Sequence, residues 1–421
     1  MDDDSMMTLA VLWFAFILFV VLTPENNEPP PINPLEQKAL YNLLNSIDPT
    51  TPWTTLYPHG FCISPPSFLH CDSKSHIVQL NFGFISDQTD LLPCSPNATL
   101  QDPLLFTAFP YLRKISFSNC FNNTHKPIHS IPSFPPSLQH LLFIDNPSFI
   151  SPLQPFLTNL TASLKKLVLI GNGFYGELPQ QIGAFHDLLE LTLSRNNLSG
   201  EIPASIGSLK KLEILDLSHN GFNGCVPQQV GSLISLSKLN LSYNSFGCKI
   251  PETFIHLKNL EFLDLSFNRF GKFGVPLFLG QLSKIKQVYL SGNKLSGEIP
   301  EIWEKLGAVE KIGFSNMGLV GEIPASMVVY LENLSYLGLD NNNLQGRIPD
   351  GFWYLLPYVD EINLENNNLT GRMEVTCGGD VVLKKMKLAG NIGYHLNITS
   401  DGCSSCPKGG TMGHSKRNGE F

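Results

Sequence analysis

Two short motifs in this 421-residue chain have the residue types and spacing that chemistry requires. Cys403 and Cys406 are spaced like a redox-active dithiol, and Gly171 to Gly176 match the Gly-x-Gly-x-x-Gly pattern of a phosphate-binding loop. The dithiol lacks the βαβ pattern that such a site needs, and no helix pattern begins at the glycines. The histidines have no metal-ligand spacing. We therefore expect no catalytic site, no metal and no cofactor.

The elements that position the remaining side chains follow a repeat of 24 to 26 residues. Residues 188–203 read Leu-x-x-Leu-x-Leu-x-x-Asn-x-Leu-x-Gly-x-Ile-Pro, and almost the same pattern returns at 212–227. This period predicts an α/β solenoid of leucine-rich repeats, with a parallel concave sheet and disulfide-closed caps. The ninth position of successive units holds Asn146, Asn172, Asn196, Asn220, Asn244, Asn268, Asn293, Met317, Asn342, Asn367 and Asn391.

Each position of the repeat has an expected role. Apolar residues at positions 1, 4 and 6 face the core, because no single coil can cover them and stacking buries them. The Asn at position 9 offers its amide to backbone groups at the turn that follows the strand. Met317 interrupts this column, so either Asn316 takes over its hydrogen bonds or that coil is locally loosened.

The chain is expected to divide into four segments. Residues 1–25 are a signal peptide or an uncleaved anchor, and 26–111 are an N-terminal cap with one helix and an irregular first strand at 76–82. Residues 112–395 hold about 12 repeats. Residues 396–421 are a C-terminal cap and a disordered tail.

The helix of the N-terminal cap should begin at Asn33 and Pro34. Asn is a good N-cap, Pro suits the first helical position, and Glu36 completes a capping box. One face of this helix is apolar and should cover the open end of the first coil. That face comprises Leu35, Ala39, Leu40, Leu43, Leu44 and Ile47.

The nine cysteines fall into local groups, as expected for disulfides formed in an oxidising compartment. Cys120 occupies the ninth position of an early repeat, so a free thiol in the Asn column is the alternative there. Cys406 is left over on the favoured scheme, and either Cys403 or Cys406 could pair with the same partner. The expected pairs are Cys62 with Cys71, Cys94 with Cys120, Cys225 with Cys248, and Cys377 with Cys403.

The first residues and the glycosylation motifs indicate the secretory pathway. Residues 6–22 are an apolar run followed by a polar, proline-rich stretch, which is typical of a signal peptide. No later segment approaches the roughly 20 apolar residues of a membrane span. Membrane association is therefore expected only through the N-terminal run or a missing C-terminus. The Asn-x-Ser/Thr acceptors are Asn97, Asn122, Asn159, Asn197, Asn240, Asn333, Asn368 and Asn397.

The net charge and the concave positions indicate what the surface binds. A net charge of −8 without a basic stripe excludes a nucleic-acid partner. Positions 3, 5, 7 and 8 face the concave side, because strand side chains alternate in direction. Aromatic residues gather there in the central coils and could form one contiguous binding patch, although a ring at position 8 is also a structural habit of such repeats. The candidate ligand-binding residues are Asp216, His219, Tyr243, Phe262, Asp264, Phe267 and Tyr289.

The Leu-x-Gly-x-Ile-Pro motif, at 198–203 and again at 295–300, resembles plant receptor-like proteins with extracellular leucine-rich repeats. The cap from Glu36 to Tyr41, the position of Cys94 and the stretch 118–121 are similar to the branch of that family that holds Piriformospora indica-insensitive protein and Too Many Mouths. The resemblance implies a plant-type superhelix without enzymatic activity. It also implies a cell-surface or apoplastic receptor for an extracellular peptide, protein or microbial ligand, acting with a leucine-rich-repeat receptor kinase in signalling or defence. The alternatives are a secreted inhibitor of microbial polygalacturonase-type enzymes and a wall or matrix protein.

Overall fold

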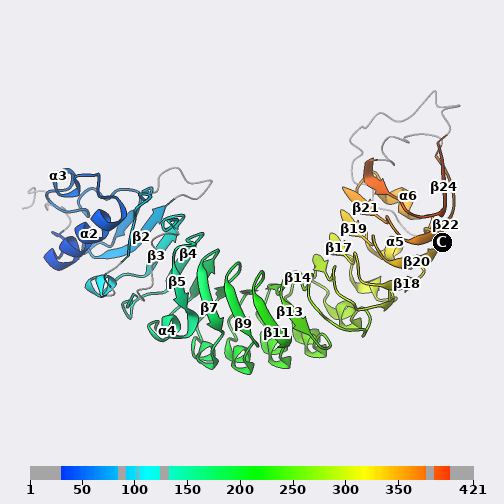
Figure 1. Cartoon of the computed structure of the whole chain (residues 1–421), viewed down its shortest axis with the longest axis horizontal. Coiled ribbons are helices and arrows are strands. Elements are labelled where there is room, and N and C mark those ends of the chain that lie inside the picture. Colours follow the sequence, from blue (N-terminus) through cyan, green and yellow to red (C-terminus); the bar gives the residue numbers. More distant parts are fainter. Residues whose placement is uncertain are drawn as a thin grey trace, which may run out of the picture.

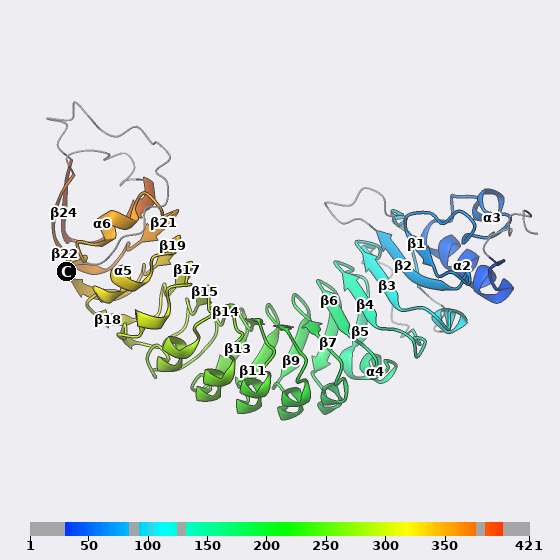
Figure 2. The ribbon, with the colours of Figure 1, turned by 180° about the vertical axis from the view of Figure 1, so that it is seen from behind.

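The computed structural model describes residues 30–83, 92–100, 102, 104–123, 132–375 and 384–398. The described coils stack into one open arc, with the N-terminal cap at one end and the last coils at the other (Figure 1). The strands of one large sheet line the inner side of the arc, and short helical turns line its outer side (Figures 1 and 2). The predicted leucine-rich-repeat solenoid with a parallel concave sheet is confirmed.

Within the described residues the inner sheet has fourteen strands, which are parallel apart from the antiparallel first pair. Corresponding residues of successive repeats are direct neighbours across it; Asp216, for example, pairs with Asn240, and Asn240 pairs with Asp264. The order is β1 (Leu69–Cys71), β2 (Ile77–Gly83), β3 (Lys114–Ser118), β4 (His140–Ile144), β6 (Lys166–Ile170), β8 (Glu190–Thr192), β10 (Ile214–Asp216), β12 (Lys238–Asn240), β14 (Phe262–Asp264), β15 (Gln287–Tyr289), β17 (Lys311–Gly313), β19 (Tyr336–Gly338), β21 (Glu361–Asn363) and β23 (Met386–Lys387).

Two smaller parallel sheets lie on one flank, formed where each coil leaves the inner sheet. The first contains β5 (Ile150–Pro152), β7 (Gly173–Glu177), β9 (Asn197–Gly200), β11 (Gly221–Cys225) and β13 (Ser245–Gly247). The second contains β16 (Gly297–Glu298), β18 (Leu319–Gly321), β20 (Asn343–Gly346), β22 (Asn368–Val375) and β24 (Gly393–Ile398). Gly173 lies in β7, so the glycine motif at 171–176 begins a strand and not a helix.

The helical turns follow the Ile-Pro pair of the repeat. Pro203 and Pro227 precede such turns with φ of −71° and −68°, which is the value that the proline ring enforces. The 3₁₀ turns are η1 (Leu105–Ala108), η2 (Gln180–Ala184), η3 (Ala204–Ser208), η4 (Gln228–Ser232), η5 (Glu252–His256), η6 (Leu277–Gln281) and η7 (Trp303–Lys305). The α-helices are α2 (Pro34–Ile47), α3 (Trp53–Leu56), α4 (Leu153–Thr158), α5 (Ser326–Tyr330) and α6 (Phe352–Leu355).

The core runs along the whole solenoid and consists of the predicted apolar positions. Leu188, Leu191 and Leu193 are fully buried, as are the matching leucines of the next coils. Each coil buries these side chains only against its neighbours, so the stability of one coil depends on the coils beside it.

The Asn column forms the hydrogen-bond ladder that the sequence predicts, and Asn220 illustrates it. Its Nδ2 donates to the carbonyl oxygens of Leu193, Leu217 and Ser218 at 2.9, 3.2 and 3.0 Å. Its Oδ1 accepts the backbone N–H of Leu198 at 3.0 Å. One side chain therefore bonds backbone groups of two neighbouring coils.

Met317 replaces this ladder by an apolar contact. Its side chain is 1% exposed, while Asn316 is exposed with φ of +54° and does not take over the ladder role. By analogy with Leu198, an Asn at position 317 would accept the N–H of Leu295. Among the described residues, that N–H has no hydrogen-bond partner.

The N-terminal cap departs from the prediction in two details. Asn33 caps α2 as expected, accepting the N–H of Leu35 at 2.8 Å. Glu36, expected in a capping box, is 1% exposed and instead accepts the backbone N–H of Ile77 on β2 at 3.0 Å. Leu35, expected on the covering face, is 71% exposed, because it lies at the open rim of a hollow between α2 and η1. The rest of the predicted face is buried.

Three of the predicted disulfides are present: Cys62–Cys71, Cys94–Cys120 and Cys225–Cys248. The alternative of a free Cys120 thiol is therefore wrong. Cys377, Cys403 and Cys406 lie outside the described residues, as do the signal peptide and the C-terminal tail.

The bond between Cys225 and Cys248 ties β11 to the end of β13 and gives a testable prediction. Replacing both residues with Ser should lower the free energy of unfolding by about 2 to 4 kcal/mol, because the unfolded chain regains the freedom that the closed loop removes. Chemical denaturation of the variant beside the wild type measures the difference. Peptide mapping without reductant that recovers both thiols free would contradict the prediction.

Candidate functional site

A column of exposed side chains at position 8 runs along one edge of the concave sheet. Each residue precedes a ladder Asn and turns the chain with positive φ: 55° at Arg195, 53° at His219, 52° at Tyr243 and 52° at Phe267. This left-handed turn lets the next residue, the Asn, point inward while the side chain at position 8 faces solvent.

His219, Tyr243 and Phe267 form one continuous ring stack within this column. Ring centroids lie 4.2 Å apart between His219 and Tyr243 and 4.4 Å apart between Tyr243 and Phe267, with interplanar angles of 11° and 21°. Tyr243 is 44% and Phe267 46% exposed. The next coil has Gly292 at this place, where a Cβ would lie 2.7 Å from Cδ1 of Phe267. The last ring thus lies over a glycine, which ends the stack.

Phe262 and Tyr289 form a second, separate ring cluster deeper in the sheet. Their centroids are 5.9 Å apart, and Nζ of Lys238 lies 5.4 Å from the centre of the Phe262 ring. The ring contacts among the described residues do not join this pair to the stack at position 8. The single contiguous patch expected from the sequence is therefore two clusters, because Phe262 is at position 3 and Phe267 at position 8 of the same coil.

The two predicted aspartates form a polar floor between these clusters. Asp216 is 7% exposed; it accepts the N–H and the hydroxyl of Ser218 and receives Nδ2 of Asn240 at 3.2 Å. Asp264 is bonded in the same way to Ser266, and burial raises the pKa of its carboxyl. Both carboxylates are largely occupied by the protein itself, so the exposed rings offer a partner more surface.

A second concave site was missed in the sequence. Strands β4 and β6 carry aliphatic residues at positions 5 and 7: Leu142 and Ile144 pair in register with Val168 and Ile170. Other coils have polar or small residues at these positions, such as Ser218. The repeat register alone identifies these aliphatic residues, because positions 5 and 7 of successive coils are neighbours in the sheet. A search for aromatic residues does not find them.

The glycosylation motifs differ in accessibility. Asn159 and Asn240 are half-buried, and the amide of Asn240 is engaged by Asp216. The side chain of Asn397 lies outside the described residues. The exposed acceptors are Asn97, Asn122, Asn197, Asn333 and Asn368.

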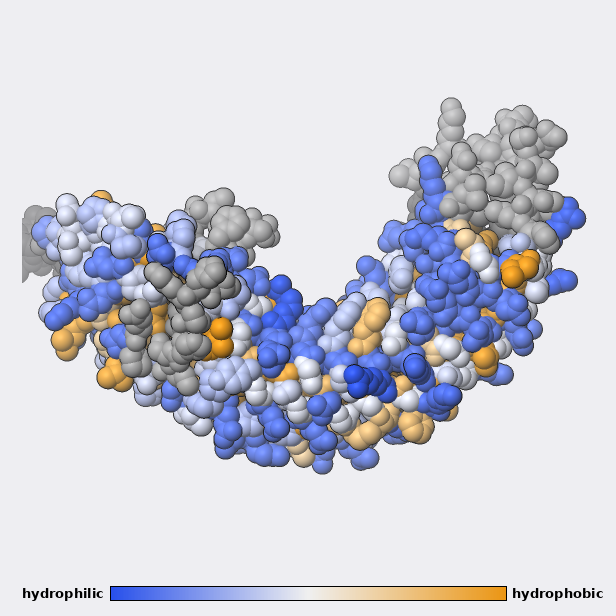
Figure 3. Space-filling model, viewed as in Figure 1, coloured by the Kyte–Doolittle hydropathy of each residue, from blue (hydrophilic) through white to orange (hydrophobic). Residues whose placement is uncertain are grey.

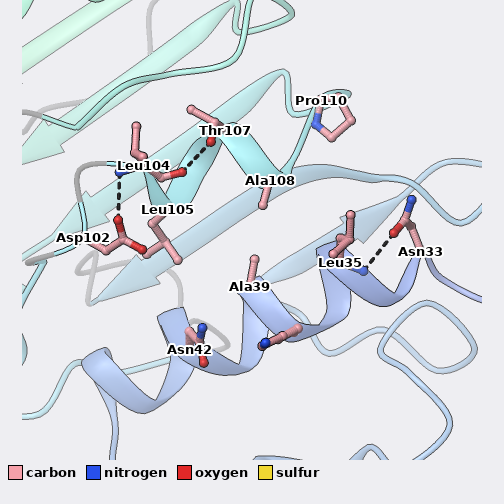
Figure 4. A pocket seen from close by; sticks show the side chains of 11 residues that line it. Asn33, Leu35, Ala39, Asn42, Asp102, Leu104, Leu105, Thr107, Ala108 and Pro110 are labelled. Atoms are coloured by element: carbon pink, nitrogen blue, oxygen red, sulfur yellow. Dashed lines mark hydrogen bonds between the residues drawn. The ribbon is translucent and has the colours of Figure 1, made fainter.

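Other parts of the described surface are weaker candidates for a binding site than the two concave sites. A hollow of ≈ 390 Å³ lies between α2 and η1, with Leu35 and Leu104 on its rim (Figure 4). Its polar groups bond locally: Asp102 accepts the N–H of Leu104, and the hydroxyl of Thr107 donates to the carbonyl of Leu104. The flank seen in Figure 3 is mostly hydrophilic with scattered apolar side chains. Within the described residues there is no His, Cys, Asp and Glu cluster fit for a metal, nor a helix long and apolar enough to cross a membrane.

The fold and the ladder are those of a leucine-rich-repeat solenoid, and the family model of a leucine-rich repeat region matches residues 152–348. It resembles the plant receptor-like proteins. Protein TOO MANY MOUTHS of Arabidopsis thaliana is 34% identical over 162 residues, which are 37% of this chain and 26% of that protein. Receptor like protein 29 of the same plant is 32% identical over 172 residues, which are 38% of this chain and 35% of that protein. The matches thus span about a quarter to a third of these relatives.

Solved structures support the same fold. The Arabidopsis receptor kinase HAESA, in complex with a peptide hormone and a co-receptor, gives a TM-score of 0.63 at 23% identity, covering 86% of this chain and 62% of that one. A plant ice-binding protein gives 0.53 at 20% identity, covering 88% of this chain and 100% of that one. Proteins with such different titles share the arc, so function must be argued from the concave side chains.

Proposed function

We propose that the chain is a non-catalytic receptor-like protein of the cell surface or apoplast. It binds an extracellular peptide, protein or microbial ligand on its concave sheet and acts with a leucine-rich-repeat receptor kinase in signalling or defence. Its likeness to Receptor like protein 29 supports the receptor class. The HAESA complex, with its peptide hormone and co-receptor, supports the kind of partners.

The exposed stack of His219, Tyr243 and Phe267 is the observation that carries this proposal. The turn at position 8 does not require rings, because Gly171 and Asn341 occupy the same place in other coils with similar φ. Gly and Asn are also the residues that tolerate this backbone best. Three adjacent coils nevertheless carry a ring at position 8, although the backbone there favours Gly or Asn. Together the rings form a rigid apolar anchor of the kind that dominates interfaces.

A binding experiment on the stack tests the proposal. Secreted plant peptides captured by the purified chain are identified by mass spectrometry, synthesised, and titrated by calorimetry. Tyr243→Ala and Phe267→Ala should each weaken binding by more than about 1 kcal/mol, roughly fivefold, while thermal unfolding stays unchanged because exposed rings add little to the core.

Tyr175→Ala is the matched control, since Tyr175 is 43% exposed on the flank strand β7. It should leave the affinity unchanged. Equal affinity in the wild type and both stack variants would rule out the stack as the ligand site. Phe262→Ala and Tyr289→Ala then show whether the second cluster takes that role.

A second experiment tests the receptor class. Affinity purification from plant membranes should recover a leucine-rich-repeat receptor kinase together with the wild-type chain. A free apoplastic protein that inhibits microbial polygalacturonase and recovers no kinase would overturn the receptor proposal in favour of an enzyme inhibitor.

A further inference from the structure

The concave surface of β4 and β6 has an apolar floor that no other pair of described coils has. Leu142 lies beside Val168, and Ile144 lies beside Ile170, on strands about 4.8 Å apart. Val168 is 5% exposed, and the other three are half-buried. The floor is only two strands wide, so it fits one or two side chains of an extended segment. A bilayer or a nucleic-acid duplex would need a far larger surface.

A row of basic residues borders this floor at position 3. Lys114, His140 and Lys166 are in register on β3, β4 and β6. Lys166 is paired with Glu190 at 2.9 Å, whereas Lys114 and His140 have no carboxylate within ion-pair distance among the described residues. Burial together with Lys166 lowers the pKa of both Lys114 and His140. Lys114 is therefore the unpaired positive charge of the row, and His140 adds a ring nitrogen that can donate a hydrogen bond.

The opposite border of the floor is fixed by an ion pair that spans a coil. Arg195 donates to Oδ1 of Asp145 at 2.8 Å across the coil of Gly171. A Cβ at Gly171 would lie 2.1 Å from that same oxygen, so glycine is needed for the carboxylate to lie there. Asp145 and Arg195 both stand at position 8, in the same column as His219 and the ring stack. The floor and the stack thus follow one another along the same concave face.

The geometry points to a subsite on β3, β4 and β6 for a peptide segment that carries an aliphatic side chain next to a carboxylate. The aliphatic group rests on Leu142, Ile144, Val168 and Ile170, and the carboxylate faces Lys114 and His140. This assignment rests on the proposed function and adds the chemistry and the direction of the ligand. The acidic segment lies toward the N-terminal coils, and the segment that contacts the ring stack lies toward the central coils.

Two synthetic hexapeptide libraries test the subsite, one with a free C-terminal carboxylate and one amidated. Peptides retained by the purified chain are sequenced by mass spectrometry. Enrichment of Leu, Ile or Val beside Asp or Glu in both libraries identifies a side-chain carboxylate. Enrichment of a terminal aliphatic residue in the free-acid library alone identifies the C-terminus. Either result supports the subsite, and retention of basic or purely polar peptides overturns it.

Variants then locate the binding of the best retained peptide. Lys114→Gln should weaken it about tenfold or more, because a charge-assisted hydrogen bond is lost, and rising salt should weaken the wild type in the same direction. Ile170→Ser, which installs the Ser of neighbouring coils, should also weaken it. Lys311→Gln, at position 3 of a distant coil, is the control and should have no effect.

The outcomes separate the subsite from the proposed function. Peptide binding that depends on Tyr243 and Phe267 but not on Lys114 and Ile170 would contradict the subsite and still support the receptor proposal. Binding that tracks Lys114 and Ile170 supports the subsite. Failure of both libraries and of secreted plant peptides to bind the folded chain would overturn both.

Discussion

Asn220→Ala is expected to lower the free energy of unfolding by about 1 to 3 kcal/mol. The amide of Asn220 donates to the carbonyls of Leu193, Leu217 and Ser218 and accepts the N–H of Leu198. Alanine leaves the N–H of Leu198 without this acceptor, whereas the three carbonyls keep donors from Asn196, Asn244 and Arg195. Chemical denaturation measures the loss, and hydrogen exchange should show faster exchange at the N–H of Leu198 first.

Met317→Asn is the matched test at a ladder position that holds no Asn. The new amide would supply an acceptor for the N–H of Leu295, while the change removes an apolar side chain that is 1% exposed. These effects oppose one another, so we expect a neutral or stabilising result. A larger loss of stability at Met317 than at Asn220 would show that the ladder register is wrong.

Glu36→Ala is expected to destabilise the N-terminal cap by about 1 to 3 kcal/mol, because the backbone N–H of Ile77 loses its buried acceptor. Glu36→Gln keeps an acceptor oxygen at the same place. Its effect should therefore be much smaller than that of Ala, and the comparison separates the hydrogen bond from the charge.

The charge of Glu36 also predicts a pH dependence. Burial raises the pKa of Glu36 above its ordinary value, opposed by the bond from Ile77 and by the nearby His76. A carboxyl whose pKa is higher in the folded state adds stability below its unfolded pKa, about 4.3, and loses it as the pH rises through the folded value. The wild type should therefore lose stability relative to Glu36→Gln as the pH rises above about 4.3. A wild type that gains on the variant over this range would contradict the assignment.

Fold similarity leaves the function of the chain open. The plant ice-binding protein and HAESA both superpose on it at under 25% identity. Positions 3, 5, 7 and 8 of this chain hold a ring stack in the central coils and a basic-bordered aliphatic floor toward the N-terminal end. These positions are free to vary because they do not contribute to the shared core.

Sequence periodicity alone determined the architecture. Every coil must bury the same leucines and bond the same turn groups, so the spacing of Leu215 and Asn220 recurs and fixes strand, turn and stacking at once. The same register put Cys225 and Cys248 in neighbouring coils and identified the concave positions. The start of α2 followed from local chemistry at Asn33 and Pro34.

Tertiary structure decided where individual side chains went. Glu36 accepts the backbone N–H of the distant Ile77 and does not cap its own helix, because folding brings β2 beside α2. The aromatic residues divide into two clusters, since rings at position 8 lean along the column while Phe262 and Tyr289 meet across adjacent strands. The floor on β4 and β6 becomes a site only when two coils lie side by side. The bond of Glu36 and the division of the rings depend on rotamers and on packing between elements, which the repeat pattern does not specify.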